Sequence, residues 1–286
     1  MKLRNRILAV LLVASMTTLS AFTPSYSASA GNLNEERTYY VFGSDGTYEK
    51  SYTLSAVSNV SSSSSASTTA IVGGTDDTYP DYTKSGVVKI YNSAGTMETG
   101  FVVDEHIIAT AAHVVYSAGT SGDNSSYPTS ILFHDSDGNV ISSETITDIV
   151  STHIPYKYIT TGGTDYDYAL IEVEEDLSDY MCFNLGVTLD SFDSSEATVY
   201  VTGYANDGKA VSGEGVVTTS STDYKLYYTA DTIKGMSGGP VYIETTFNNK
   251  IYYTVVSICH EGSTTASNGA RMNTTLIQFY LNNPNL

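Results

Sequence analysis

Hydrophobic and polar residues alternate in many short segments of this chain, which is the two-residue period of β-strands with one buried face. Turn residues, such as the Asp-Gly pair at 137–138, separate these segments. The pattern predicts strands at 86–92, 129–133, 140–146, 169–173, 198–204, 213–219, 225–229, 240–245 and 251–260, with a hairpin at 100–110. A connector at 176–192 divides the strands into two sets, so the sequence predicts an all-β fold of two barrels.

The two ends of the chain have different patterns. Basic residues precede a compact apolar run at 7–13, and small residues follow at 28–30, which predicts a secretory signal peptide at 1–30 and an extracellular protein. A membrane anchor is the alternative, but the apolar run is too short to span a bilayer. Near the other end, Asn273 is placed to cap a short helix over 275–282, with Leu276 and Tyr280 on one face.

Residues 31–70 are polar and include five consecutive serines at 61–65. A segment with so few core-forming residues is not expected to fold alone, which predicts a propeptide or linker. It ends just before the tetrapeptide Ile71-Val72-Gly73-Gly74. This tetrapeptide is either a new N-terminus, produced by cleavage after Ala70, or an ordinary strand that enters a glycine turn.

Composition narrows the choice of partners. The chain has a net charge of −18, and the excess of acidic residues lies after residue 70. A strongly acidic body repels nucleic acid and anionic membranes, so neither is an expected partner. The 24 tyrosines suit the pleated surfaces of a β-protein.

The segment 235–240, Gly-Met-Ser-Gly-Gly-Pro, has the strongest chemical signal. A serine between glycines sits on a sharp turn that can expose its hydroxyl and aim backbone N–H groups at one point, as acyl transfer requires. By itself the segment also fits an ordinary glycine-rich turn. Two further segments favour chemistry: Thr-Ala-Ala-His at 110–113 and Asp-Tyr-Ala-Leu-Ile at 167–171.

Together these segments supply the three groups of a serine nucleophile site. His113 would take the proton of Ser237, and Asp167 would orient His113 and stabilise the imidazolium. The backbone N–H groups of Gly235 and Ser237 would form the oxyanion hole. Asp165 competes with Asp167 for the acid role, because it lies two residues away on the same face of an extended segment.

The order His113, Asp167, Ser237 resembles the trypsin/chymotrypsin-fold serine endopeptidases, from about Ile71 to the C-terminus. The spacings are 54 residues (113 to 167) and 70 residues (167 to 237). Within that fold the chain is most similar to the secreted glutamyl endopeptidases of bacteria. The resemblance implies two six-stranded antiparallel β-barrels, at 71–190 and 191–286, with the active site between them, and it favours Asp167 as the acid because that residue directly precedes an apolar strand.

The specificity pocket can be interpreted in two ways. Trypsin-like enzymes have an acid six residues before the serine, and Asp231 occupies that position, which would favour Lys or Arg. Thr232 and His260 instead resemble the pocket residues of glutamyl endopeptidases, as does the Gly-Ala-Arg-Met-Asn segment at 269–273. Threonine and histidine can donate hydrogen bonds to a buried substrate carboxylate. We therefore expect cleavage after Glu, with Asp as a second option, and we expect Asp231 to point away.

The resemblance also concerns the N-terminus of the mature protein. Trypsin-like enzymes have an Asp before the serine, which pairs with the new α-amino group after activation, but here that residue is Met236. The Ile71 ammonium would instead serve the pocket, as in the glutamyl endopeptidases. Cleavage after Ala70 does not match Glu specificity, so maturation would need another protease or a less selective self-cleavage.

No metal or organic cofactor is expected. Residues 134–139 look like part of a calcium loop, but Ile146 occupies the position where a bidentate acid is needed, so a hairpin turn is the better interpretation. Cys259 and His260 are neighbours on a strand and should point to opposite faces, which argues against a thiolate dyad or zinc pair. Cys182 and Cys259 permit one disulfide in a secreted protein, and the sequence leaves their pairing open. His106, His134 and His153 are expected to have no catalytic role.

The sequence thus predicts a secreted serine endopeptidase that acts on proteins or peptides, and the resemblance implies a monomer. Trypsin-like or broad specificity on the same fold is the first alternative. The second is a non-catalytic secreted binding module, which the complete set of His113, Asp167 and Ser237 argues against.

Overall fold

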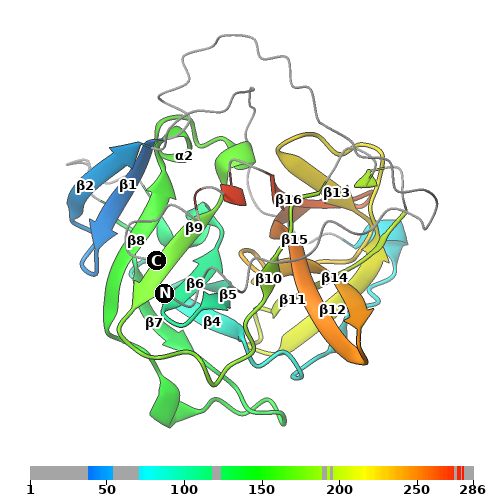
Figure 1. Cartoon of the computed structure of the whole chain (residues 1–286), viewed down its shortest axis with the longest axis horizontal. Helices are drawn as coiled ribbons and strands as arrows, with labels where there is room; N and C mark the ends of the chain where they lie inside the picture. Colours follow the sequence, from blue (N-terminus) through cyan, green and yellow to red (C-terminus); the bar gives the residue numbers. More distant parts are fainter. Residues whose placement is uncertain are drawn as a thin grey trace.

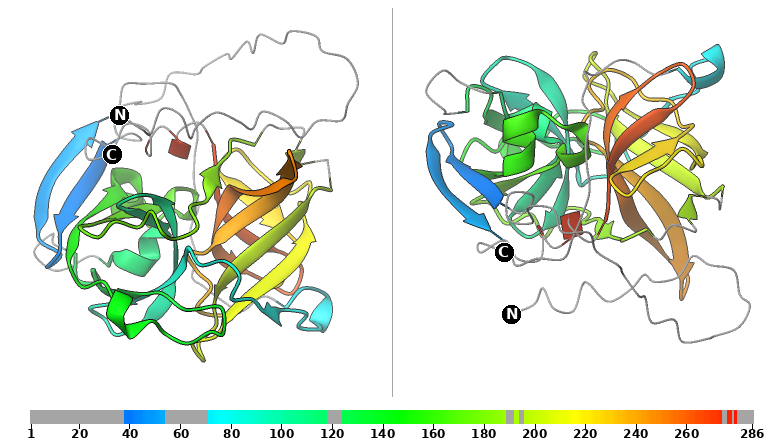
Figure 2. Two further views of the ribbon diagram at one scale, coloured as in Figure 1. Left: turned by 60° about the horizontal axis from the view of Figure 1, so that its bottom comes forward. Right: turned by 90° about the horizontal axis from the view of Figure 1, so that it is seen from above.

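The computed structural model of the protein describes residues 38–53, 71–117, 124–188, 192–193, 196–273, 276–277 and 279. Two β-sheets lie side by side and account for most of this part of the chain (Figures 1 and 2). The expected signal peptide at 1–30 lies outside the described residues.

The first sheet contains a six-stranded barrel in the order β8-β9-β6-β5-β4-β7, in which every neighbouring pair is antiparallel. Its strands are β4 (Val87–Asn92), β5 (Met97–Asp104), β6 (Ile107–Thr110), β7 (Pro128–Leu132), β8 (Ile149–Pro155) and β9 (Ala169–Val173). Ile131 of β7 and Ile146, just before β8, exchange two backbone hydrogen bonds of 2.9 Å, which closes the sheet on itself.

The second sheet contains another six-stranded barrel, in the order β13-β16-β15-β14-β11-β12. Its strands are β11 (Thr198–Tyr204), β12 (Ala210–Val216), β13 (Lys225–Tyr228), β14 (Pro240–Phe247), β15 (Lys250–Gly262) and β16 (Ser267–Arg271). A bridge between Val217 and Tyr228 closes this sheet, and the Thr229 N–H donates to Val216 O at 2.9 Å. The prediction of two six-stranded antiparallel barrels is therefore confirmed.

Short strands connect the two barrels across the boundary expected near residue 190. β3 (Tyr79–Pro80) pairs with β12, and β10 (Asn184–Leu185) pairs in parallel with β15, so both join the second sheet. The ring of Phe183 lies 5.6 Å from Phe101 of the first barrel and 5.6 Å from Tyr242 of the second. Since these aromatic rings are buried, they pack the two barrels into one core.

Several predicted elements are shifted or absent. The strand expected at 140–146 is replaced by a turn of 3₁₀ helix, η4 (Ser142–Glu144), and the pairing partner is β8 instead. β8 gave no alternating signal because almost all its residues are buried on both faces. β16 was missed because its sequence, Ser-Asn-Gly-Ala-Arg, has no β-branched or aromatic residue.

Part of the expected propeptide or linker at 31–70 is folded, and it folds against the first barrel rather than alone. β1 (Thr38–Gly43) and β2 (Tyr48–Thr53) form a hairpin, and β1 pairs with β8 of the first barrel. Val41 and Phe42 are fully buried. The segment folds because it docks on an existing sheet edge, and its turn residues Asp45 and Gly46 are typical of a hairpin.

Three short helical segments contain or adjoin residues predicted for the site. They are α1 (Ala112–Val115), η3 (Val72–Gly74) and η5 (Thr164–Tyr166). A longer helix, α2 (Tyr156–Thr161), follows β8. At the C-terminus, residues 276, 277 and 279 are helical, and the Leu276 N–H donates to Asn273 Oδ1 at 2.9 Å, as the cap prediction requires; Tyr280 lies outside the described residues. No helix in the described ranges is long and apolar enough to cross a membrane.

Candidate active site

His113 and Asp167 meet at one end of the first barrel. His113 lies in α1, directly after β6, and Asp167 lies between η5 and β9. The His113 Nδ1–H donates to Asp167 Oδ2 at 2.7 Å, and the His113 backbone N–H donates to Oδ1 at 2.9 Å. Both carboxylate oxygens therefore hold one histidine, from its ring and from its backbone. Asp165 makes no described contact with His113.

Burial and charge act against each other on this pair. Burial alone would lower the pKa of His113, but the charge and hydrogen bond of Asp167, with Glu98 and Glu261, raise it above its ordinary value. Burial alone would raise the pKa of Asp167, but His113 and His260 hold it well below its usual range. The carboxylate is fully buried and remains ionised, so it can stabilise an imidazolium at His113.

Ser237 comes from the second barrel, on the loop between β13 and β14. Gly235 has φ of +104°, and Gly238 has φ of +83°, in the left-handed region that favours glycine. A Cβ at Gly235 would lie 2.4 Å from Tyr204 O, and a Cβ at Gly238 would lie 2.2 Å from Thr110 Oγ1. Glycine is therefore required at positions 235 and 238 by both the backbone conformation and the lack of space for a side chain.

Thr99, on β5 of the first barrel, is a supporting residue that the sequence did not reveal. Its hydroxyl donates to Gly235 O at 2.7 Å, and its backbone N–H donates to Ser237 O at 3.0 Å. These bonds fix the peptide groups that follow Gly235 and Ser237, and with them the orientation of the turn. The adjacent Glu98 is also near the site: burial raises the pKa of its carboxyl, with His113 and Lys234 opposing. No local motif marks a residue that acts across two barrels.

His260 contacts both Ser237 and Asp167. Its backbone carbonyl accepts a hydrogen bond from Ser237 Oγ at 3.0 Å, and its ring Nε2 lies 3.0 Å from Asp167 Oδ2. The pairing of β15 with β16 is irregular between Cys259 and Glu261, so His260 stands outside the regular ladder. The same Asp167 oxygen thus accepts from two imidazoles. The structure gives this ring a partner that the resemblance to pocket histidines did not imply.

The hydrogen bond expected between Ser237 and His113 is not formed here. His113 Nε2 is buried and has no hydrogen-bond partner among the described residues, while the serine hydroxyl is directed to His260 O. The rings of His113 and His260 have centroids 5.0 Å apart at an interplanar angle of 83°. A rotation of the serine side chain is therefore needed before His113 can take its proton.

His113, Asp167 and His260 also offer donor atoms within 4.8 Å of one another, a spacing that a metal ion can use. Both imidazoles, however, direct a nitrogen at the same carboxylate oxygen, at 2.7 and 3.0 Å. These are ordinary lengths for hydrogen bonds to a charged acceptor. The set is therefore accounted for as a hydrogen-bonded group.

Asp231 is buried and turned toward the segment that follows Ile71. Its Oδ1 accepts from the Val72 N–H at 2.6 Å, and its Oδ2 accepts from the Asp77 N–H at 3.1 Å. The Gly73 N–H reaches Thr264 O, in the loop between β15 and β16, at 3.4 Å. Both oxygens of Asp231 are thus engaged with the beginning of the protease region.

Thr232 lies next to Asp231 and is also buried. Its Oγ1 is 3.3 Å from Ser267 Oγ, and Ser267 in turn donates to Ala230 O at 2.7 Å. Because the Ser267 proton is used on Ala230, the Thr232 hydroxyl is left as the donor in this pair. The structure places the segment after Ile71 close to the residues before Ser237, and it places His260 against Asp167 and Ser237.

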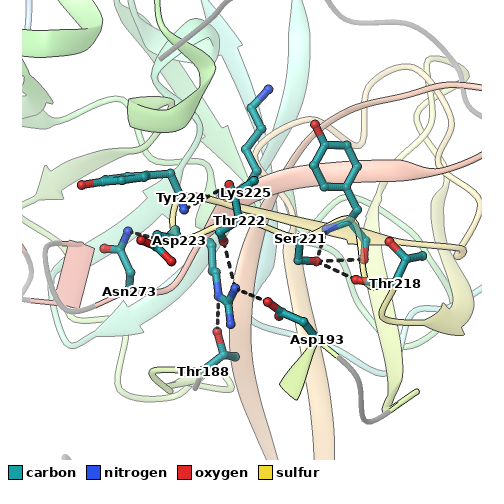
Figure 3. Close-up of polar contacts among 11 residues, drawn as sticks. Thr188, Asp193, Thr218, Ser221, Thr222, Asp223, Tyr224, Lys225 and Asn273 are labelled. Atoms are coloured by element: carbon teal, nitrogen blue, oxygen red, sulfur yellow. Dashed lines mark hydrogen bonds and ion pairs between the residues drawn. The ribbon is translucent and has the colours of Figure 1, made fainter. Parts of the chain in front are cut away.

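Arg271, from the segment that resembles Gly-x-Arg-x-Asn, has a structural environment. Its guanidinium bonds to Asp193 Oδ2 at 2.9 Å, Thr188 Oγ1 at 2.6 Å and Thr222 O at 2.8 Å. Asn273 Nδ2 donates to Asp223 O at 2.9 Å nearby. Figure 3 shows these partners gathered from the connector and from the loop that leads into β13. The segment therefore connects β16 to the connector and to the loop before β13.

The remaining candidate residues have local partners. Asp135 accepts from the backbone N–H groups of Asp137 and Asn139, both at 2.9 Å, so residues 134–139 form a turn capped by their own side chain. Cys182 and Cys259, both described, form no disulfide with each other. Burial raises the pKa of the Cys259 thiol to about 12, which leaves it protonated at neutral pH.

His106, His134 and His153 have partners away from His113. His106 Nδ1 lies 2.8 Å from Glu175 O, His134 Nδ1 contacts the Tyr204 hydroxyl, and His153 Nε2 lies 2.9 Å from Ser151 Oγ. The contact of His134 with Tyr204 joins the two barrels, the other two lie within the first barrel and its loops, and none of the three involves Ser237.

Comparisons with known proteins identify the family of the chain and agree with its fold. A family model described as a trypsin-like peptidase domain matches residues 98–246, more than half of the chain, including His113, Asp167 and Ser237. A glutamyl endopeptidase of Bacillus licheniformis is 31% identical over 166 residues, which cover 56% of this chain and 49% of that protein. The match therefore spans about half the length of this curated relative.

Two solved structures share the fold. A Glu endopeptidase in complex with MPD has a TM-score of 0.61 and 20% identity, over 74% of this chain and 98% of that chain. The protease Anisep from Arthrobacter nicotinovorans has a TM-score of 0.53 and 17% identity, over 71% of this chain and 97% of that chain. The expected resemblance to the glutamyl endopeptidases is thus confirmed.

Proposed function

Because the chain belongs to the trypsin-like peptidase family, we propose that it is a secreted serine endopeptidase that cleaves after Glu through an acyl-enzyme. The observation that carries the proposal is the meeting of two barrels at one point: His113 and Asp167 from the first, and Ser237 from the second. Protein or peptide substrates follow from the family. Secretion and removal of the propeptide rest on the sequence of residues 1–70.

The reaction begins when a substrate carbonyl approaches Ser237. The serine hydroxyl leaves the His260 carbonyl and turns to His113 Nε2, which takes its proton as the oxygen attacks. The developing oxyanion receives the N–H groups of Gly235 and Ser237, in a turn that Thr99 orients. His113 then protonates the leaving amine, and water hydrolyses the acyl-enzyme by the same steps.

Specificity for an acidic side chain is supported by the engagement of Asp231. A carboxylate that accepts from the Val72 and Asp77 N–H groups is not directed at a substrate lysine. Thr232 lies beside it, and its hydroxyl, which donates to Ser267 Oγ here, would turn to a substrate carboxylate. Cleavage before Ile71 would create an ammonium one residue from the amide that Asp231 already holds, which would offset the charge of Asp231 and lower its repulsion of an acidic substrate group.

Matched peptides that differ only before the scissile bond test this specificity. We expect kcat/KM for Glu to exceed that for Gln by at least about 100-fold, since a site built for a charged group is left unpaired by the neutral one. The measurement uses Glu, Asp, Gln, Lys, Phe and Ala peptides with the secreted mature protein. Preference for Lys, lost in Asp231→Asn, would move the specificity to Asp231 and reject the proposal.

The pH dependence follows from the raised pKa of His113. The base must be neutral to accept the serine proton, so activity should appear as pH rises through the pKa of His113 in the folded protein. We expect the acid limb of kcat/KM to have its midpoint above the ordinary histidine value of about 6.5. A profile measured from pH 5 to 9 gives the midpoint, and a value at or below 6.5 would contradict the expectation.

We assign His260 a positioning role that acts through Asp167. The 3.0 Å contact from its ring requires the proton on Nε2, so His260 is a second donor to the carboxylate that orients His113. Its Nδ1 is buried, has no described hydrogen-bond partner and lies 3.7 Å from Glu261 Oε1. The alternative is the pocket role that the resemblance implied, in which His260 binds the substrate carboxylate.

Two substitutions separate these roles. His260→Leu removes the donor, and a hydrogen bond to a charged group contributes about 1.5–3 kcal/mol, so we expect kcat to fall about 10- to 100-fold with little change in KM. His260→Gln places an amide N–H near the position of Nε2 and should recover most of the activity. A raised KM for Glu peptides and a loss of the preference for Glu over Gln would instead support the pocket role.

A further inference from the structure

The hairpin of β1 and β2 is built into the first barrel although it precedes the protease region. β1 pairs antiparallel with β8 over five residue pairs, from Tyr39 with Pro155 to Gly43 with Ser151. The hairpin thus extends the sheet beside β8, as the blue strands in Figures 1 and 2 show. Without it, the backbone of β8 would be an open sheet edge.

Buried side chains connect this hairpin to the barrel. Val41 and Phe42 have 0% exposure, and the ring of Phe42 lies 5.6 Å from that of Tyr116. Tyr116 directly follows α1, the helix that carries His113, and its ring lies 6.3 Å from Tyr158 of α2. Phe42 is therefore part of the packing that supports the end of α1.

The turn of the hairpin makes a second connection to the same place. Gly46 O accepts from the Asn124 N–H at 2.9 Å, and a Cβ at Gly46 would lie 2.3 Å from Asn124 O. The Asn124 side chain accepts from the Ser117 N–H at 3.0 Å and donates to Val115 O. Asn124 thus links the hairpin turn to the last residues of α1 and to the chain that follows it.

We propose that residues 38–53 are a permanent part of the first barrel, and that they stay bound without a covalent link when the chain is cut before Ile71. The residues that bind the hairpin to the barrel all lie in β1, β2 or the turn between them. The cut would therefore fall between this hairpin and the protease region and would remove none of these contacts. The partner of the mature protease is then its own N-terminal peptide, which adds a strand to β8. The statement that this peptide supports activity rests on the proposed function, whereas its retention does not.

Retention is tested with the full secreted chain in which residues 61–65 are replaced by the recognition sequence of an unrelated site-specific protease. Ser237→Ala is included to prevent self-digestion. After the cut, gel filtration and mass spectrometry should find the N-terminal fragment and the remainder of the chain, which contains the protease region, together in a 1:1 ratio. Separation of the fragment from a folded protease body under native buffer would overturn the proposal.

A pair of substitutions identifies the contact. Phe42→Ala should weaken retention of the cut fragment by about 10- to 100-fold, as expected for the loss of a fully buried aromatic side chain. Lys50→Ala, at an exposed position of β2 paired with Val41, should leave retention unchanged. Equal retention in both variants would overturn the assignment of Phe42 as the side chain that holds the cut fragment. Before the cut, the hairpin of the Phe42→Ala variant is still covalently attached to the protease region. Circular dichroism of the uncut variant therefore shows whether the whole chain folds.

The link to activity is measured separately, in the chain with Ser237 intact. Removing the fragment in mild denaturant and refolding the body should lower kcat toward Glu peptides at least about 10-fold, and adding a synthetic 38–53 peptide should restore it. A body that keeps full activity without the fragment would show that the hairpin does not support α1. If neither form cleaves any peptide, the proposed function fails, but the retention experiment still gives its answer.

Discussion

Replacing Ser237 by alanine is expected to remove peptide hydrolysis almost completely, with kcat lowered by about a million-fold. The side chain is the only group on the turn at 235–239 that can attack a carbonyl, since the other positions are glycine and methionine. What remains is the rate that the oxyanion donors give to attack by water. The measurement is steady-state hydrolysis of the Glu peptide, with folding checked by circular dichroism.

Ser263→Ala is the matched control for this substitution. Ser263 is an exposed serine in the loop between β15 and β16, and its hydroxyl contacts only its own loop. Its loss should leave kcat unchanged. A phosphonylating reagent specific for activated serines should modify the unchanged protein once, at Ser237. Retained hydrolysis in Ser237→Ala would reject the triad and leave the binding module as the remaining interpretation.

The second large effect is expected for Asp167→Asn, which should lower kcat by about 10⁴-fold. An asparagine keeps the shape but replaces one oxygen by an NH₂ group, which cannot accept from the His113 ring at 2.7 Å. The substitution therefore favours the wrong tautomer of His113 and removes the charge that stabilises the imidazolium. The fall should be in kcat more than in KM, because no contact with the substrate changes.

Asp165→Asn is the control, and it decides between the two acids that the sequence left in competition. Asp165 makes no described contact with His113, and burial raises the pKa of its carboxyl, with Lys225 opposing. A neutral amide is therefore tolerated at this position, and we expect kcat to stay close to that of the unchanged protein. A larger loss from Asp165→Asn than from Asp167→Asn would reverse the assignment.

The sequence predicted much of the fold because many strands have one buried face. The strand expected at 198–204 has those bounds in the structure, and the hairpin at 100–110 corresponds to β5 and β6. The prediction failed where burial was not one-sided. β8 is buried on nearly every residue, and the segment at 140–146 has the apolar ends of a strand but pairs only through two isolated bridges.

The hairpin at 38–53 shows a different limit. The polar composition of residues 31–70, with the serine-rich stretch at 61–65, masks the pattern of two strands around an Asp-Gly turn. A two-stranded hairpin is marginal in water, and it folds here because β8 offers an edge and Tyr116 offers a surface for Phe42. No property of residues 38–53 alone specifies either of these partners.

By itself the sequence determined the all-β class and the identities of the three groups proposed for catalysis, because each lies in a short motif whose backbone demands are local. The glycines at 235 and 238 are an example, since a left-handed turn can be recognised from the residues that tolerate it. Only the tertiary structure decided what His260 and Asp231 contact. His260 reaches Asp167 across the two barrels, and Asp231 holds the amides of Val72 and Asp77 from a distant part of the chain. Such contacts depend on where the barrels place their loops, and that follows from the packing of the whole core rather than from any segment.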